Sequence, residues 1–136
     1  MSASGTAASL YAATISPTSI TGGEPEQAKD KTHHLKDAFK LIGDFRGPFD
    51  LGLIPIGAYD PRYIMSSMHC NPFDSVNIFK DTKCERSIGI HYGTWVLTEE
   101  DVLEPPKLLK QALAKAGIPE TGIFDVCEIG ESREFG

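Results

Sequence analysis

Two apolar runs, separated by a segment long enough for a helix, constrain the fold of this chain most. The first run spans Phe49 to Gly57, and the second spans Ser87 to His91. A continuous apolar run of this length is typical of a strand that is buried on both faces. Because Pro55 has no N–H to donate to a neighbouring strand, we expect the first strand to be irregular or at a sheet edge there.

Three segments with helical spacing of apolar residues surround these strands, and a last short strand follows them. Each helix has recognisable capping residues at its ends. The predicted helices run from the cap Thr32 to Gly43, from the cap Asn71 with Pro72 at its first position, and from Pro105 or Pro106 to Gly117; the last strand is Ile123 to Ile129. The alternation of helix and strand predicts an α/β layer arrangement.

Three strands and three helices make a small sheet. Such a sheet leaves one face or one edge open unless another unit covers it. The chain therefore has the pattern of one half of a larger domain. The alternative is a small three-layer domain that covers its own sheet.

Residues 1–30 differ from the rest of the chain. They are rich in Ser, Thr, Gly and Ala, and no charged side chain precedes Glu24. A signal peptide needs a positive start and an apolar block, and a transit peptide needs arginines, so there is no clear targeting signal. We expect residues 1–30 to be a low-complexity, disordered segment and residues 31–136 to form the folded portion.

Net charge and cysteine content limit the partners, the cellular compartment and the metal sites that we expect for this chain. The net charge is −6, which argues against nucleic acid as a partner because phosphates require a basic face. The three cysteines have no CxxC spacing, which favours a reduced intracellular compartment and gives no Cys-based zinc finger. No apolar run approaches the roughly 20 residues that cross a membrane.

His91 is the most informative single residue. It ends an apolar strand, and Gly93 and Thr94 then turn the chain away, which is a way to place a metal ligand at the mouth of a site. A catalytic zinc needs three protein ligands and an open position, and no recognisable spacing supplies the others here. The alternative is a histidine that packs at a strand end without a metal.

Six sequence blocks, taken in order, strongly resemble one known family. They are Gly47 to Tyr59, Pro61-Arg62, Met68-His69, Ile90 to Thr94, Glu104-Pro105-Pro106 and Gly130 to Arg133. They are similar to the C-terminal part of the N-acylphosphatidylethanolamine-hydrolysing phospholipase D family, a branch of the metallo-β-lactamase superfamily. The resemblance covers residues 35 to 136.

This resemblance implies a fold and a reaction. The fold would be the C-terminal half of a four-layer αββα metallo-β-lactamase sandwich, with two zinc ions per complete site between its sheets. The reaction would hydrolyse N-acylphosphatidylethanolamine to an N-acylethanolamine and phosphatidic acid. It implies a phospholipid substrate, peripheral membrane contact, and a membrane-associated or mitochondrial location inside the cell.

Two residues acquire roles by this resemblance, and two more are candidates from their own chemistry. His91 matches the last histidine among the zinc ligands. His69 would lie near the substrate phosphodiester as a catalytic imidazole, and the alternative is an exposed histidine of a loop. Arg62 would bind phosphate, although an arginine after Asp60-Pro61 also commonly forms a surface ion pair. Tyr59 would line the substrate pocket, or pack in the core.

The chain also departs from the family. The metal-binding run His-x-His-x-Asp-His is absent from the sequence, and so is the Asp of a Gly-Asp-Thr-Gly segment. We therefore expect an incomplete zinc site and an inactive isolated chain. Two alternatives stay open: a non-catalytic remnant that acts as an interaction module, with homo-oligomerisation covering its sheet, and another metallo-β-lactamase-type hydrolase such as a lactonase or nuclease.

Overall fold

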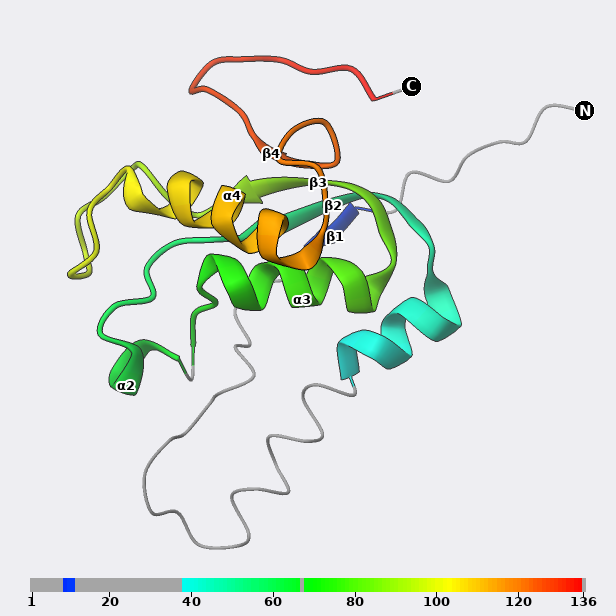
Figure 1. Cartoon of the computed structure of the whole chain (residues 1–136), viewed down its shortest axis with the longest axis horizontal. Coiled ribbons are helices and arrows are strands. Elements are labelled where there is room, and N and C mark those ends of the chain that lie inside the picture. Colours follow the sequence, from blue (N-terminus) through cyan, green and yellow to red (C-terminus); the bar gives the residue numbers. More distant parts are fainter. Residues whose placement is uncertain (1–8, 12–37, 67, 136) are drawn as a thin grey trace, which may run out of the picture.

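The computed structural model describes residues 9–11, 38–66 and 68–135. Its elements, in chain order, are β1 (Ser9–Tyr11), β2 (Phe49–Pro55), α2 (Arg62–Met65), α3 (Pro72–Thr82), β3 (Cys84–Ile90), α4 (Glu104–Ala116) and β4 (Phe124–Val126) (Figure 1). A further helical stretch, residues 38–46, precedes β2. The predicted α/β class is confirmed.

The four strands form one parallel sheet in the order β1-β2-β3-β4. β2 has a neighbour on each side over Leu51–Leu53, but at Pro55 it pairs with β3 alone, so this end of the strand lies at an edge as expected. Pro55 is tolerated because it is the last residue of β2, where it pairs with Ile90. The hydrogen bonding resumes directly afterwards, since the N–H of Ile56 donates to the carbonyl of Ile90 at 2.9 Å.

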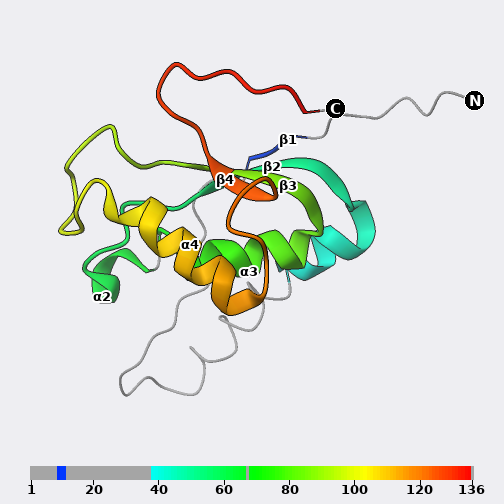
Figure 2. The ribbon, with the colours of Figure 1, turned by 45° about the horizontal axis from the view of Figure 1, so that its top comes forward.

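Helices α3 and α4 lie on the same face of this sheet (Figures 1 and 2). Each connects two parallel strands that are neighbours, and successive right-handed crossovers in one direction place their helices on one face. The core lies between these helices and the sheet. Its deeply buried apolar side chains include Ile54, Ile56, Ile78, Leu109, Leu113 and Phe124.

The second face of the sheet is also apolar. Strand side chains alternate between faces, so Leu51, Leu53, Ile88 and Ile90 point away from the helices that Ile54 contacts. Ile88 is only 8% exposed, yet it lies outside the cluster that forms the core under the helices. The described strands form a single sheet, so the four-layer sandwich stays a prediction.

The caps of α3 and α4 confirm two predictions. Asn71 accepts a hydrogen bond from the N–H of Asp74, whose carboxylate in turn accepts one from the N–H of Asn71. Pro72 opens the helix without losing a bond, because the first helical N–H groups have no partner within the helix. Gly117 ends α4 in the left-handed conformation, with φ +70°.

The sequence indicated a helix end at Gly43, and this is wrong. The helical stretch continues to residue 46. A Cβ at position 43 would overlap the backbone carbonyl of Asp81, at the end of α3. The glycine is therefore required by the close approach of two backbones. The predicted start at Thr32 lies outside the described residues.

Strand limits also shift. β3 begins at Cys84, three positions before the predicted start at Ser87, and it ends at Ile90 rather than His91. β4 is only Phe124–Val126, shorter than the predicted Ile123 to Ile129. In the N-terminal segment, Ser9–Tyr11 form β1 because their backbone pairs with Leu51–Leu53 of β2. The other residues of 1–30 lie outside the described part.

Candidate active site

A cavity of about 190 Å³ lies at the carboxyl ends of the two central strands. Gly57 and Ala58 line it from the segment after β2, and His91 and Tyr92 line it from the segment after β3. Residues 94–98 form its outer wall, together with Glu100 and Pro105. Ligands commonly bind at this edge of parallel α/β sheets, because the strands end there in loops that can diverge.

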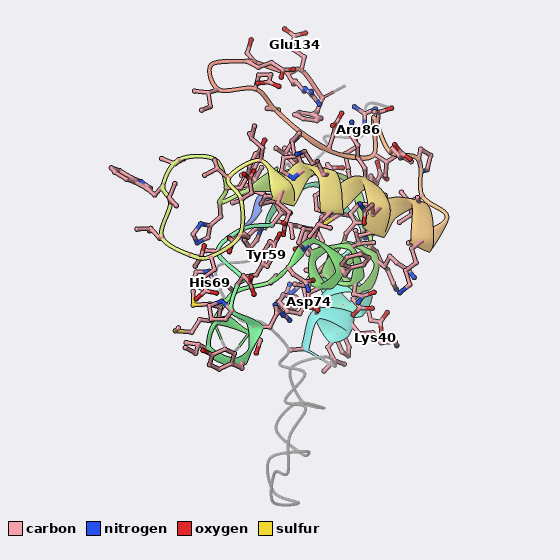
Figure 3. All side chains as sticks on the ribbon, turned by 60° about the vertical axis from the view of Figure 1, so that its left-hand side comes forward. Lys40, Tyr59, His69, Asp74, Arg86 and Glu134 are labelled. Carbon is pink, nitrogen blue, oxygen red and sulfur yellow. The ribbon has the colours of Figure 1, made fainter. Side chains whose placement is uncertain are left out.

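His91 and His69 meet at this edge. Their ring centroids are 5.1 Å apart and their planes are inclined by 66°. His91 directly follows β3 and has φ +63°, an uncommon conformation for a residue with a side chain. His69, labelled in Figure 3, comes from the loop between α2 and α3. The structure thus brings together the two histidines that the sequence singled out.

The electrostatic surroundings of His69 are mixed. Burial lowers the pKa of its imidazole, and the neighbouring His91 lowers this pKa further. The carboxylate of Glu100 acts in the opposite direction and raises it. The net result is a pKa below the ordinary value of histidine.

Arg62 holds the loop of His69 against α3. Its guanidinium forms a 2.7 Å ion pair with Asp74, and its other terminal nitrogen donates to the carbonyl of His69 at 3.4 Å. The structure therefore shows the ion pair that was the alternative to phosphate binding. A role of Arg62 toward substrate stays a prediction.

Tyr59 packs in the interior at 5% exposure. Its hydroxyl donates a 2.6 Å hydrogen bond to Glu104 at the start of α4. Burial, followed by the contact with Glu104, raises the pKa of Tyr59. The packing role considered from the sequence is thus visible, and the substrate-binding role stays a prediction.

Glu100 is a residue of the site that sequence reasoning missed. Its carboxylate accepts hydrogen bonds from three successive backbone N–H groups, those of Ala58 at 2.7 Å, Tyr59 at 3.3 Å and Asp60 at 3.0 Å. Burial opposes ionisation, but these bonds and one from the side chain of Thr98 outweigh it and lower the pKa of Glu100. The only signal in the sequence was the acidic run Glu99 to Asp101 after Thr98.

The residues at this edge do not fit a complete two-zinc centre. Across residues 9–11, 38–66 and 68–135, no group of three or more His, Cys, Asp and Glu side chains could hold a metal ion. Cys70 follows His69, but burial raises the pKa of its thiol to about 12, so it is protonated at neutral pH. His91 as a metal ligand stays a prediction.

The fold and the site define an α/β chain with a histidine pair beside a cavity at the carboxyl edge of a parallel sheet. This chain is 45% identical over 98 residues to N-acyl-phosphatidylethanolamine-hydrolyzing phospholipase D 1 of Caenorhabditis elegans, a match that covers 71% of the chain. It is 35% identical over 108 residues to the mitochondrial N-acyl-phosphatidylethanolamine-hydrolyzing phospholipase D of Saccharomyces cerevisiae, a match that covers 76% of the chain. An uncharacterized protein of Mycobacterium tuberculosis is 36% identical over 78 residues, which is 55% of this chain and 20% of that protein.

The chain belongs to the N-acyl-phosphatidylethanolamine-hydrolyzing phospholipase D family, as its motifs predicted. It spans only about a quarter of the relatives it matches, 27% of the C. elegans protein and 22% of the yeast protein. No family model matches the chain. Within the described residues, no helix is both long and apolar enough to span a membrane.

Proposed function

We propose that this chain supplies the His69–His91 side of the catalytic site of a phospholipase D that hydrolyses N-acylphosphatidylethanolamine. The observation that supports this most is the ring contact between His69 and His91, since His91 lines the cavity. In this proposal the imidazole of His69 donates to a phosphoryl oxygen or protonates the leaving alkoxide. His91 would give one nitrogen to a zinc centre whose other ligands come from outside the described residues.

The surrounding residues position these histidines. Arg62 ties the loop of His69 to α3 through Asp74, and Glu100 fixes the backbone that begins one wall of the cavity. Rigid supports of this kind matter because small misplacements of catalytic groups slow a reaction strongly. We further propose that the sheet is one layer of a metallo-β-lactamase sandwich, with Leu51, Leu53, Ile88 and Ile90 facing the partner sheet.

A chimera tests the function directly. In the C. elegans relative, the 98 matched residues would be replaced by the corresponding residues of this chain. We expect the chimera to release N-acylethanolamine from N-acylphosphatidylethanolamine, as followed by mass spectrometry, and His69→Ala and His91→Ala to reduce turnover by about a hundredfold or more. Lys110→Ala, at an exposed position of α4, is the control and should leave turnover unchanged.

A folded chimera that binds zinc but hydrolyses no phospholipid would contradict the proposal. It would favour the non-catalytic interaction module, for which the apolar second face of the sheet supplies a surface. The names of the C. elegans and yeast relatives favour a phospholipase over a lactonase or nuclease. We also propose for this chain the mitochondrial location that is named for the yeast relative. Microscopy of a tagged full-length protein would test it.

A further inference from the structure

The C-terminal segment folds back onto β4, the outermost strand on one side of the described sheet. In Figures 1 and 2 this segment lies on the opposite side of β4 from α3 and α4. It includes Gly130 to Arg133, a block of the family resemblance that the candidate site does not use. Glu131 closes a turn here, since its N–H donates to the carbonyl of Glu128 at 3.0 Å and its carboxylate accepts from the N–H of Glu128 at 2.8 Å.

β4 has a row of backbone groups that no described strand uses. It pairs with β3 in parallel, with Val126 opposite Gly89. The N–H of Ser87 donates to the carbonyl of Ile123 at 2.7 Å, so the backbone groups of Ile123 point at β3. Because successive residues of a strand direct these groups to alternate sides, Val126 directs its N–H and its carbonyl outward, at the edge of the sheet.

One ion pair occupies both outward groups of Val126. The N–H of Val126 donates to Oδ1 of Asp125 at 2.8 Å, and Nη2 of Arg133 donates to the carbonyl of Val126 at 2.9 Å. The arrangement is closed, because Nη1 of Arg133 donates to Oδ2 of Asp125 at 3.1 Å. A neighbouring strand would present the same chemistry to Val126, one acceptor and one donor from its backbone.

The surroundings keep this pair ionised and oriented. Burial raises the pKa of Asp125, but the hydrogen bonds from Val126 and Arg133 outweigh burial and lower this pKa. Nε of Arg133 also donates to Glu131 at 2.6 Å, so the guanidinium is held by several partners at once. A partly exposed ion pair adds little to stability, so its consequence here is to occupy the backbone groups of Val126.

An unoccupied strand edge is a template for pairing with another chain, and charged side chains at an edge prevent this. The nearest available partner is a second copy, because two copies related by a two-fold axis would pair their β4 edges antiparallel and extend both sheets. We propose that the Asp125–Arg133 pair is an edge guard, which occupies the outward N–H and carbonyl of Val126 and prevents strand pairing between copies of this chain. The guard takes no part in the proposed reaction, so either proposal can fail without the other.

Light scattering over a concentration series tests the guard. The parent protein is the full chain with Leu53→Lys, which suppresses association through the apolar second face of the sheet. Arg133→Ala and Asp125→Ala should each associate at about tenfold lower concentration than the parent, because backbone groups of Val126 become free to pair. Arg46→Ala and Glu134→Ala remove the same charges at exposed positions and should leave association unchanged.

Hydrogen exchange locates the contact. A peptide that contains residues 124–126 should gain protection as Arg133→Ala associates, because a second copy then covers Val126. In Asp125→Ala at low concentration, the same peptide should exchange about fivefold faster than in the parent, since the N–H of Val126 has lost its acceptor.

Val126→Pro is the rescue variant. Proline offers no N–H to a second copy, and because Val126 directs its N–H outward, the substitution removes no hydrogen bond to β3. Adding Val126→Pro to Arg133→Ala should return association to the level of the parent, whereas association caused by unfolding would persist. Circular dichroism and thermal unfolding check that each variant keeps the fold.

Three results would overturn the proposal. In the first, Arg133→Ala and Asp125→Ala stay as dispersed as the parent, so the ion pair prevents nothing. In the second, the variants associate but residues 124–126 gain no protection, which places the contact elsewhere. In the third, Val126→Pro does not reverse the association of Arg133→Ala, so the edge of β4 is not the surface that pairs.

Discussion

His69 lies edge-on against His91, with 5.1 Å between the ring centroids, although α3 and β3 separate them in the sequence. The contact unites two predicted site residues at one end of the sheet. It adds no third metal-binding side chain from the described residues. The pair is therefore only part of a metal site, so we expect its affinity for zinc to be low.

We expect the isolated chain to bind zinc weakly and without a defined two-metal stoichiometry, because a catalytic zinc takes three protein ligands. Elemental analysis after dialysis against trace zinc measures this. His91→Ala should lower the residual zinc further, while Lys110→Ala should not. Two tightly held zinc ions per chain would show that the missing ligands lie in this sequence after all.

Glu100→Gln should destabilise the fold, because Glu100 accepts hydrogen bonds from the N–H groups of Ala58, Tyr59 and Asp60. The loss should be about 1 kcal/mol, at the low end for bonds to a charged group because Glu100 is partly exposed. Urea unfolding at neutral pH measures it. The exposed neighbour Glu99 gives the matched control Glu99→Gln, which should cost little.

The same carboxylate predicts a pH dependence. The pKa of Glu100 in the folded chain lies below its usual value of 4.5. The unfolded chain therefore binds the proton more readily, so this stabilisation is present above pH 4.5 and is lost as the pH falls through the folded value. Unfolding at several pH values below 4.5 should show a smaller loss for Glu100→Gln than for the unchanged chain. If stability falls equally with pH in both proteins, the hydrogen bonds of Glu100 do not make stability depend on pH.

Gly43→Ala should destabilise by about 1–3 kcal/mol, because the added methyl group meets the backbone carbonyl of Asp81 and neither backbone can yield easily. Gly117→Ala is the comparison. At Gly117 a Cβ would meet nothing within 4 Å, and the cost is only the left-handed conformation, about 1 kcal/mol. Equal losses of stability in thermal unfolding would argue against the close packing of the helical stretch 38–46 on α3.

The apolar second face of the sheet predicts self-association of the chain. Leu53 and Ile90 are half-buried on this face, and apolar sheet surfaces that stay partly open to solvent associate or aggregate. Light scattering should detect oligomers or aggregates, and Leu53→Lys should reduce them. Ile129→Lys, a change of the same kind in the C-terminal segment, should not.

A monodisperse monomer with a sharp thermal transition would contradict this expectation. It would mean that residues of the chain outside the described part cover the sheet. If the half-domain interpretation holds, co-expression with the N-terminal portion of the C. elegans relative should restore solubility by burying Leu53 and its neighbours.

The caps at Asn71 and Gly117 were readable from the sequence because their interactions are local. The capping box of Asn71 with Asp74 closes within one helical turn, so the residue types are sufficient to predict it. Gly43 shows the limit of such reasoning. Its residue type suggested a helix end, whereas its actual role comes from Asp81, a distant residue that no local pattern reveals.

By itself the sequence determined the α/β class, the position of β2 and β3, and, through family resemblance, the choice of His69 and His91. Apolar runs and capping residues suffice for these, since they act over one element at a time. Only the tertiary structure decided that the two histidines touch and that Glu100 binds the backbone of Ala58, a residue 42 positions away. Contacts of this kind depend on how the parallel strands align their carboxyl ends, and that alignment results from packing of the whole sheet against α3 and α4.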